Sequence, residues 1–513
     1  MVATSPRPSA SRPLVAAVDA GTTGARAVAF DPAGRLVAEV RQPYRTRSPR
    51  PGWAEQDAHD WAEGAVSVLR RLAARTRRAG TISAIGLTGQ CPTMVVADEH
   101  GRPLRPGMLY RDNRAVDEAQ QMRDRVGDAV MHQRTGHLPE AFHVGPKLLW
   151  IRRNEPEVFA RTRLVLQPRD VVLHRLTGLA VTDETHANAT LLFNLRGRAW
   201  DPWLLEAVDL DPGLFPAALP SWARAAELPD RAASELGLPA GVPLVIGAAD
   251  SQCAAFGAGV AAPGPVSEMA GASSCLNSAV VSPLDDLRVT HYSHVVPGCF
   301  CTELGVNTTG AAIGWAVNAL GYAGFGELAS DAERFRRRLQ RGGAGSRGTA
   351  AVDAAPLFLP YLGDGERDDP SARAGFLCLS DRHDRAALAF AVIEGVSLGV
   401  RSVLAVLEQA GSPLSELRVG GGGARLGLAG QVKADLLGRG VLHLDIDPAG
   451  FGAAMLAAGE AGLSAEAGAA IGATLRRARR FTPSRWGSAF ESERAAWFDQ
   501  VRPSAAVHSP REA

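Results

Sequence analysis

The sequence lacks the features that mark several large classes of protein. Only two of its 55 basic residues are lysines, and 54 acidic residues leave a net charge of +1. No surplus of positive charge therefore favours nucleic acid or an anionic membrane as a partner. The start, Met1 to Pro13, has no apolar core of signal-peptide length, and no later stretch reaches the roughly 18 uninterrupted apolar residues of a membrane span. We expect a cytoplasmic protein with a disordered leader over 1–13.

Cysteine is also scarce, with six residues scattered along the chain. The one close pair, Cys299 and Cys301, has neither zinc-site nor thioredoxin spacing, so we expect reduced, buried cysteines. His291 and His294 are spaced like metal ligands, but no third ligand is near in the sequence. We interpret them as ordinary surface or pocket histidines.

What the chain does have is length and apolar material. It holds 513 residues, 46% of them hydrophobic. At about 150 residues per domain this length predicts two or three domains with ample cores. We favour two large domains.

The apolar run Pro243 to Ala249 ends in a single carboxylate, Asp250, after which apolar residues resume at helical spacing. Asp250 is thus predicted at a strand-to-helix turn, where open α/β sheets place their chemistry. It could be only the N-cap of the following helix. The two interpretations are compatible, because the positive helix end keeps the carboxylate ionised and able to accept a proton.

Two turns rich in glycine and hydroxyl groups are each predicted between two strands. Leu14 to Phe30 contains Gly21, Thr22 and Thr23, and Val266 to Val281 repeats the pattern less closely. Glycine lets the backbone approach a phosphate, and hydroxyls and free amides can donate to it. Asp19 at the first strand end could hold a hydrated Mg²⁺. Taken singly, either turn could be an ordinary hairpin.

Between the two turns, Ser83 to Asp98 predicts a buried strand, a polar elbow and a second strand. The aromatic and paired charges of Tyr110 to Arg114 suit the wall of a polyol pocket, although Asp112 and Arg114 alone would be interpreted as a surface ion pair. The segment Thr182 to His186 is predicted as a polar loop, for capping or ligand contact.

In the second half, Thr308 to Gly310 is predicted as a turn that opens an apolar helix and could present amides to a phosphate chain. Leu417 to Arg425 predicts a strand that runs into four glycines and then a helix ending near Leu437. Such a glycine run lets a flat base lie against bare backbone.

Taken together, these pieces resemble the FGGY carbohydrate kinases over roughly Leu14 to Pro483. The motifs that carry the resemblance follow one another in order: Asp19-x-Gly-Thr-Thr-x-x-Arg26, Pro51-Gly-Trp53-x-Glu55-Gln-Asp57, Gly89-Gln90, Asp112-x-Arg114, Lys147-Leu-Leu-Trp150, Leu176-Thr-Gly178 with Thr182-Asp183, Gly247-Ala-Ala-Asp250, Gly271-x-Ser273-Ser, and Gly421-Gly-Gly-Ala424-Arg425.

The resemblance implies an α/β protein with two actin-like (ribonuclease H-like) domains and a deep interdomain cleft. The corresponding segments are 14–259 for the sugar side and 260–485 for the ATP side, with a tail at 486–513. It also implies ATP and Mg²⁺ as cofactors, a small sugar or polyol as substrate, no nucleic-acid or membrane partner, and a possible homodimer.

The family's catalytic base corresponds to Asp250. Its nucleotide-binding residues correspond to Gly21, Thr22, Thr23, Arg26, Gly271, Ala272, Ser273, Gly310, Gly421, Gly422, Gly423 and Ala424. We expect substrate contacts from Gln90, Cys91, Pro92, Tyr110, Asp112 and Ser251, and a water-mediated magnesium contact from Asp19. Ala272, Cys378 and Leu426 depart from residues that are frequent in the family at positions near ATP.

Cys91 and Pro92 stand where xylulose kinases usually carry Met-His and glycerol kinases Arg-Glu. The order of motifs favours D-xylulose, while glycerol, erythritol, ribulose and gluconate remain alternatives; Arg111 or Arg114 could serve an anionic acid. An actin-like ATPase without a sugar substrate is a rival class. A nicotinamide-dependent dehydrogenase is a weaker one, because Gly420 to Gly423 lacks the expected glycine spacing.

Overall fold

A computed structural model describes residues 12–342, 354–363, 366 and 371–502. Its contacts divide the chain into two compact units. The first unit comprises Met1–Gly259, Val281–Cys301 and Pro448–Thr474, and the second comprises Val260–Val280, Thr302–Asp447 and Leu475–Ala513. Two segments thus return to the first unit after the chain has entered the second. Of the predicted leader, only residues 12 and 13 lie within the described residues.

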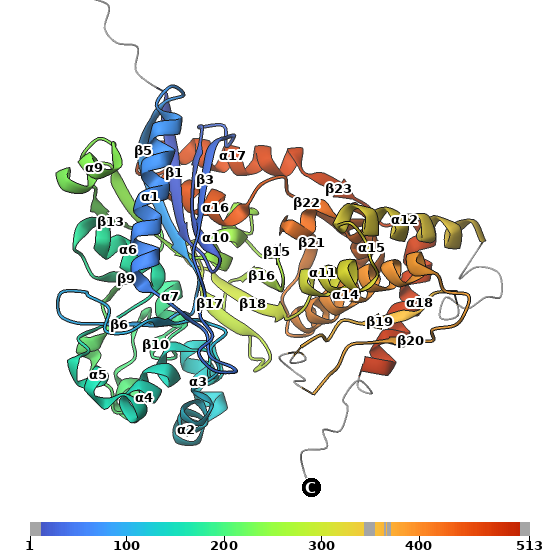
Figure 1. Ribbon diagram of the computed structural model, residues 1–513, viewed down its shortest axis with the longest axis horizontal. Helices are drawn as coiled ribbons and strands as arrows, with labels where there is room; N and C mark the ends of the chain where they lie inside the picture. The colour runs from blue at the N-terminus through green and yellow to red at the C-terminus, as the bar shows by residue number, and fades with distance from the viewer. Residues whose placement is uncertain (1–11, 343–353, 364–365, 367–370, 503–513) are drawn as a thin grey trace, which may run out of the picture. The chain divides into compact units, whose positions relative to one another are not determined.

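The first unit is built on a six-stranded mixed sheet with the order β13-β14-β5-β1-β2-β3 (Figure 1). The central strands β14, β5 and β1 are parallel, and β2, β3 and β13 join antiparallel. The bounds are β1 Pro13–Ala20, β2 Gly24–Phe30, β3 Leu36–Pro43, β5 Thr81–Gly89, β13 Arg224–Glu227 and β14 Pro243–Ala249. The strand-turn-strand prediction for Leu14 to Phe30 is confirmed.

Helices cover both faces of this sheet. One face packs on α1 (Ala58–Thr76), α6 (Pro168–Thr177) and α9 (Asp230–Leu236), whose Leu, Val and Ala side chains share one core with the strands. The other face packs on α16 (Pro448–Ala457), which also lies against α10 (Asp250–Gly257). Gly86 on β5 makes the contact between the sheet and α16 possible, because a Cβ there would lie 2.0 Å from the carbonyl oxygen of Ala453.

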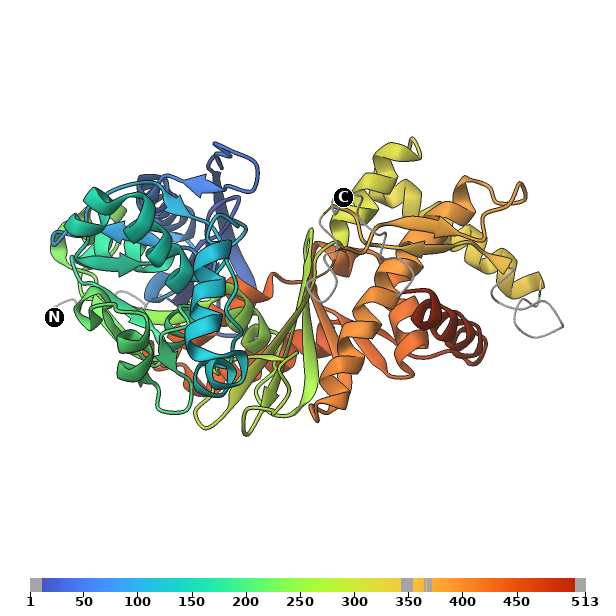
Figure 2. The ribbon, with the colours of Figure 1, turned by 90° about the horizontal axis from the view of Figure 1, so that it is seen from below.

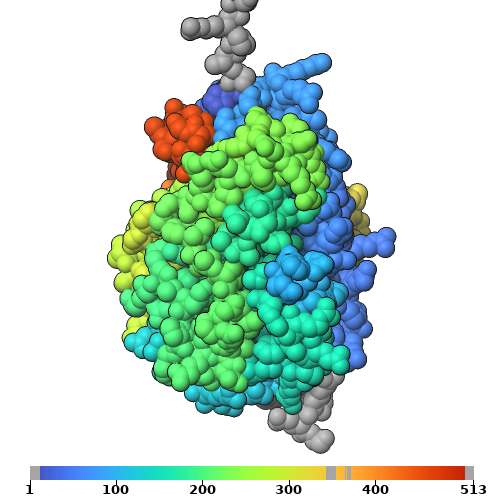
Figure 3. All heavy atoms as spheres, turned by 90° about the vertical axis from the view of Figure 1, so that its left-hand side faces the viewer, coloured from blue at the N-terminus to red at the C-terminus, as the bar shows by residue number. Residues whose placement is uncertain are grey.

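A second core of the first unit buries Met94, Met108, Met122 and Met131. The remaining elements of this unit, in and around that core, are β4 Glu55–Gln56, β6 Val95–Ala97, β7 Gly107–Met108, α2 Val116–Val126, α3 Asp128–Thr135, α4 Val144–Asn154, α5 Pro156–Arg161, β8 Leu164–Leu166, β9 Val181–Asp183, α7 Glu184–Asn188, β10 Phe193–Asn194, β11 Ala199–Trp200, α8 Pro202–Ala207, β12 Ala217–Leu219 and β17 Thr290–Ser293. Figure 3 shows blue and green segments, which are distant in sequence, forming one continuous surface on this unit.

In the second unit's sheet the strands follow the order β18-β16-β15-β21-β22-β23, with β15, β21 and β22 parallel. The bounds are β15 Gly264–Ala270, β16 Ser274–Val280, β18 Phe300–Val306, β21 Leu414–Gly421, β22 Gly440–His443 and β23 Arg479–Phe481. The second predicted hairpin is therefore present as β15 and β16. Two short strands, β19 Leu357–Leu359 and β20 Gly375–Leu377, pair separately.

The long helix α14 (Arg385–Gln409) is central to the core of the second unit. It packs against α12 (Phe325–Gly342), α15 (Gly427–Leu437) and β19, and α18 (Arg485–Val501) packs on α14 and α15 (Figure 2). The unit also holds α11 (Gly310–Ala319) and the end of α17 (Ser464–Arg477). By length and composition α14 alone among the described helices could cross a membrane, and 78% of its most apolar window is buried inside the fold.

The cysteine prediction is only partly right. All six are free thiols, and Cys253 and Cys301 are buried, but Cys378 is exposed and the other three are half-buried. His291 and His294 are buried in the first unit, so they are not surface residues. Among the described residues no group of three or more His, Cys, Asp or Glu side chains is arranged to hold a metal ion.

Candidate active site

The predicted residues of the first unit meet at one edge of its sheet. Ala20 and Ala249, the last residues of β1 and β14, both pair with Gly89, the last residue of β5. Since the three strands are parallel, the residues that follow them, Gly21, Gln90 and Asp250, leave the sheet at the same edge. This is where an open α/β sheet presents side chains to a ligand.

Asp250 is the first residue of α10, and its N-cap is Ala249. The N-cap interpretation of Asp250 is therefore wrong, although the carboxylate does lie in the helix's first turn, where the helix dipole favours negative charge. Asp250 is half-buried, and its Oδ1 accepts a hydrogen bond of 2.8 Å from the amide of Ser251. The hydroxyl of Ser251 donates to Gln252 at 3.1 Å.

Side chains behind the first hairpin hold its carbonyl groups. The carbonyl oxygen of Gly21 accepts from the Tyr44 hydroxyl and from Gln90 Nε2, the latter at 3.3 Å, and that of Thr22 accepts from Gln56 Nε2 at 2.7 Å. In a trans peptide the N–H points away from the preceding C=O. The amides of Thr22 and Thr23 therefore face away from these partners, as donors to a phosphate would have to.

Asp19 and Arg26 are cross-strand neighbours at the base of this hairpin. Arg26 Nε donates to Glu39 at 2.7 Å, so part of its charge is balanced within the sheet. Either oxygen of Asp19 would lie within 3.4–3.6 Å of a Cβ at Gly21, which places the carboxylate directly beside the phosphate-type turn. A carboxylate there suits a Mg²⁺ ion that keeps most of its waters.

Gln90 belongs to the structural support of the site. It is 1% exposed, and its amide bridges Gly21 and the side chain of Gln56, at 3.1 Å from Gln56 Oε1. Cys91 after it is half-buried and Pro92 is buried. Their predicted contacts with substrate, like those of Tyr110 and Ser251, remain proposals.

The pair Asp112 and Arg114 is not on the surface, which corrects the interpretation as a surface ion pair. Their side chains are 0% and 1% exposed, and Arg114 Nη2 contacts Asp112 at 2.6 Å and Glu55 at 2.7 Å. Asp112 also accepts from the Ala54 amide at 2.7 Å. The guanidinium lies 3.5 Å from the centre of the Trp53 ring. Two carboxylates thus balance the Arg114 charge.

Lys147 is fully buried beside this pair. Its Nζ donates to the carbonyl oxygens of Leu109 and Phe142, both at 2.6 Å. Burial lowers the pKa of Lys147 to about 7, and Asp112 only partly opposes this. The residue therefore anchors the segment that leads to Tyr110, which itself is 39% exposed.

In the second unit the hairpin Gly271–Ser273 is held by the start of α11. The carbonyl of Gly271 accepts from the amide of Gly310 at 3.1 Å, and that of Ala272 accepts from the amides of Thr309 and Ala311 at 3.0 and 2.9 Å. The turn at Thr308 to Gly310 was expected to present amides to a phosphate chain. That expectation is wrong for the amides of Thr309, Gly310 and Ala311, because they bond the hairpin instead. Gly310 instead sets the hairpin's position, since a Cβ there would lie 2.2 Å from the Gly271 oxygen.

The glycine run lies next to this hairpin. Gly421 pairs with Ala270 at the parallel ends of β21 and β15, and a Cβ at Gly423 would lie 2.5 Å from the Ala270 side chain. Gly422 to Arg425 form a 3₁₀ turn before α15. The predicted nucleotide residues Gly271, Ala272, Ser273, Gly421, Gly422, Gly423 and Ala424 are thus brought together.

A buried ion pair links α15 to β15, the strand that leads into the hairpin. Lys433 Nζ on α15 contacts both oxygens of Glu268 on β15, at 2.7 and 2.5 Å. Glu268 also accepts from Ser274, which bonds Thr309 at 3.0 Å. The chain of contacts joins α15, the hairpin and α11.

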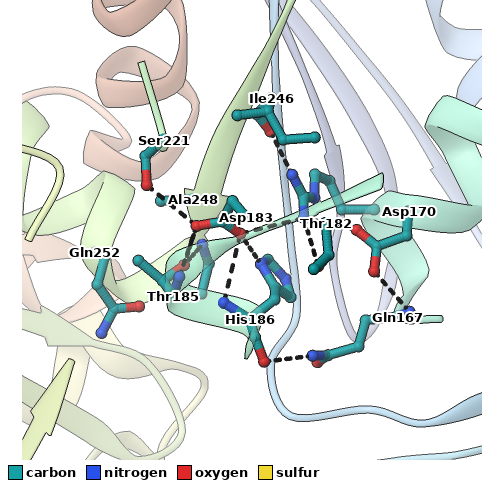
Figure 4. A network of polar contacts seen from close by, with 12 residues as sticks. Gln167, Asp170, Thr182, Asp183, Thr185, His186, Ser221, Ile246, Ala248 and Gln252 are labelled. Atoms are coloured by element: carbon teal, nitrogen blue, oxygen red, sulfur yellow. Dashed lines mark hydrogen bonds and ion pairs between the residues drawn. The ribbon is translucent and has the colours of Figure 1, made fainter. Parts of the chain in front are cut away.

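Sequence patterns missed a buried polar network in the first unit. The segment Thr182 to His186, predicted as a polar loop, is buried and forms the end of β9 and the helix α7. Asp183 accepts from Thr185 and His186 and lies 3.1 Å from Arg169 (Figure 4). The Thr182-Asp183 motif marked this segment in the sequence, but it did not reveal that Arg169 contacts Asp183.

Comparisons with known proteins agree with this arrangement. Residues 14–257 match the N-terminal domain of the FGGY family of carbohydrate kinases, and residues 266–461 match its C-terminal domain. A xylulose kinase of Lactococcus lactis is 28% identical over 88% of each chain, and a glycerol kinase of Bordetella parapertussis is 29% identical over 96% of this chain and 97% of its own. The crystal structure of a xylulose kinase from Rhodospirillum rubrum covers 96% of this chain and 99% of its own, with 29% identity and a TM-score of 0.82. The predicted fold class, two α/β domains of the actin-like (ribonuclease H-like) kind, is confirmed.

Proposed function

Because the chain belongs to the FGGY family of carbohydrate kinases, we propose that it transfers the γ-phosphate of ATP to a hydroxyl of D-xylulose. The observation that carries the proposal is the convergence of Asp250, the Gly21–Thr23 hairpin and the Gln90 elbow on one sheet edge. A carboxylate beside a phosphate-type turn is what transfer to an alcohol requires. Relatives named xylulose kinase supply the choice of sugar.

In the proposed reaction Asp250 orients the acceptor hydroxyl and takes its proton late in the step. Phosphoryl transfer has a loose transition state, so most of the catalysis lies in positioning and charge neutralisation. The amides of Thr22 and Thr23, with Arg26, are the proposed donors in the first unit. Gly271 to Ser273 and Gly421 to Ala424 are the proposed nucleotide contacts in the second.

Asp19 is the proposed magnesium-side residue, through water. When bound, Mg²⁺ neutralises the charge of the phosphates. The Asp19 carboxylate beside the hairpin fits this role, because Mg²⁺ at nucleotide sites takes few protein ligands and keeps several waters.

The geometry favours a neutral acceptor over a sugar acid. Arg114 would be the natural counter-charge for gluconate, but Asp112 and Glu55 already balance it. Arg111 is exposed and remains the other candidate cation. Hydroxyl recognition is therefore assigned to Tyr110 and Ser251, with Cys91 and Pro92 shaping the pocket, while the buried Gln90 and Asp112 support these contacts from behind.

The test is ADP release at fixed ATP and Mg²⁺ with D-xylulose, D-ribulose, glycerol, erythritol and gluconate. We expect the highest kcat/KM with D-xylulose. A tenfold preference for glycerol or gluconate would overturn the choice of sugar and leave the kinase assignment intact.

We further propose a cytoplasmic enzyme, without nucleic-acid or membrane partners, that forms a homodimer as the family resemblance implies. The near-zero net charge and the burial of α14 inside the second unit support the first part. Light scattering of the purified chain, at 53.9 kDa per copy, tests the second.

A further inference from the structure

The strand that leads to Asp250 leaves its regular pairing just before the carboxylate. β14 pairs with β5 at Leu244 and Val245 and again at Ala248 and Ala249, with a register shift between. Gly247 in the shift has φ +67, and a Cβ there would lie 1.7 Å from the Leu87 carbonyl oxygen. Such irregularities re-aim a strand end, often beside an active site. The direction of Asp250 therefore depends on what holds residues 246–249.

Three buried side chains make short hydrogen bonds to this strand end, and the Cys253 thiol adds a longer one, 3.5 Å, to the Ala248 carbonyl. Arg169 Nη1 donates to the Ile246 carbonyl at 2.7 Å, and the Thr88 hydroxyl donates to the Ala248 carbonyl at 2.8 Å. The amide of Ala249, the residue before Asp250, donates to the hydroxyl oxygen of Thr185 at 2.8 Å. Of the three bonds, the Thr185 contact is the nearest along the chain to Asp250.

Asp183 fixes the donor and acceptor roles of that hydroxyl. Thr185 Oγ1 donates to Asp183 Oδ2 at 2.7 Å, so its lone pair is left to accept from Ala249. Burial by itself would raise the pKa of Asp183, but Arg169 and His186 outweigh it and lower the pKa to about 2. The carboxylate thus stays ionised at the centre of the network in Figure 4.

We propose that Thr185, held by Asp183, which Arg169 contacts in turn, is the positioning residue that aims Asp250 at the acceptor. The proposal rests on the proposed function, in which Asp250 is the base. Asp183 is also the N-cap of α7 and accepts from the amides of Thr185 and His186. Capping explains those two bonds, but it does not require the Thr185 hydroxyl to reach Ala249 or Arg169 to reach Ile246.

The test compares Thr185→Val, which removes the hydroxyl at nearly constant volume, with Thr185→Ser, which keeps it. We expect Thr185→Val to lower kcat by about 10- to 100-fold, the scale of a small misplacement of a reacting group. The KM for ATP should change by less than about twofold, and Thr185→Ser should keep kcat within about threefold of wild type.

Thr135→Val is the matched control. Thr135 is fully buried, donates to the Met131 carbonyl at 2.8 Å and accepts from the His137 amide at 3.2 Å, so these hydrogen bonds stay within its own segment and do not reach β14. We expect its kcat to stay within about twofold of wild type. An equal loss in Thr135→Val and Thr185→Val would overturn the proposal, because any buried hydroxyl would then be equivalent.

A double variant separates aiming from general support. In the Asp250→Asn background there is no base to aim, so adding Thr185→Val should lower kcat by less than about twofold. The same 10- to 100-fold loss in both backgrounds would show a merely structural role.

Hydrogen exchange gives a measurement that does not depend on activity. The Ala249 amide should exchange at least about tenfold faster in Thr185→Val than in wild type, and at the wild-type rate in Thr135→Val. Unchanged exchange in Thr185→Val would overturn the proposal. A wild type without acceptor-dependent ADP release would instead overturn the proposed function, while the exchange data still decide whether Thr185 holds the strand end.

Discussion

The two glycine hairpins have similar sequences, but their shortest hydrogen bonds come from different kinds of group. Side chains hold the first hairpin: Tyr44, Gln56 and Gln90 bond its carbonyl oxygens. In the second, backbone amides at the start of α11 bond the carbonyls of Gly271 and Ala272. The first hairpin is therefore vulnerable to changes in residues distant in sequence. The second is vulnerable mainly where an added side chain would separate two backbones, as at Gly310.

Asp250→Asn is expected to have the largest effect. It removes the proposed base in the first unit and leaves the proposed nucleotide-binding hairpin of the second unit unchanged. We expect kcat to fall by about two to four powers of ten, or roughly 3–5 kcal/mol in the barrier, the usual share of a general base. The KM for ATP should change less than about threefold, because the proposed nucleotide elements of the second unit are untouched. Steady-state kinetics with saturating acceptor measure both constants.

Asp230→Asn is the control for that variant, since Asp230 is likewise the first residue of a helix, after the N-cap Pro229. It should leave kcat within about twofold of wild type. Near-normal turnover in Asp250→Asn would mean that Asp250 serves only the helix dipole.

Gly310→Ala tests the backbone-held hairpin. The new Cβ would meet the Gly271 oxygen at 2.2 Å, so hairpin and helix must separate. We expect the KM for ATP to rise about 10- to 100-fold, equivalent to about 1–3 kcal/mol of overpacking. Gly468→Ala in α17 is the matched control, because no atom lies within 4 Å of its added Cβ. An unchanged KM for ATP in Gly310→Ala would show that the second hairpin does not depend on its close backbone contact with α11.

Gln56→Leu tests the side-chain-held hairpin. It removes the donor to Thr22 and the acceptor that serves Trp61 and Gln90, at 2.9 and 3.1 Å. Leaving buried groups without partners costs about 1–3 kcal/mol each, so we expect a lower free energy of unfolding and a several-fold lower kcat/KM for ATP. Urea denaturation and initial rates provide the two readouts. Gln120→Leu, on the exposed surface of α2, serves as control, and equal losses in both variants would exclude a specific role for Gln56.

A pH-dependent difference in stability is expected between the two lysines. Lys433 is paired with a carboxylate, whereas Lys147 bonds only carbonyl oxygens in its described contacts. With its pKa lowered to about 7, Lys147 binds fewer protons in the folded than in the unfolded chain between about pH 7 and 10. Its contribution to stability therefore rises with pH across that window, by at most about 1.4 kcal/mol per pH unit.

The free energy of unfolding of wild type minus that of Lys147→Met should consequently increase from pH 7.5 to 9.5. A difference that stays constant over this range would show that Lys147 remains charged in the folded state.

The fold and the sheet edge were predictable from sequence because their signals are local. Both hairpins and the strand before Asp250 are marked by residues adjacent in the chain, and their place at one edge follows from parallel pairing. The supports of the site were not predictable. Arg169 reaches Ile246, 77 residues away, and nothing near either residue reveals that contact.

Polar composition misled the prediction at Thr182 to His186. Asp, Thr and His normally indicate an exposed loop, but here all three are buried: Asp183 contacts Arg169, Thr185 accepts from the Ala249 amide, and His186 bonds Asp183. The same holds for Asp112 and Arg114, whose burial depends on Glu55 and Trp53. Single residue types carry no information about such partners.

The most direct test of the central claim is whether ATP turnover requires an acceptor. ADP release by the wild-type chain should be at least about 100-fold faster with saturating D-xylulose, or with the best sugar of the panel, than without any acceptor. An equal rate of ADP release with and without every acceptor would contradict the kinase account and favour an actin-like ATPase.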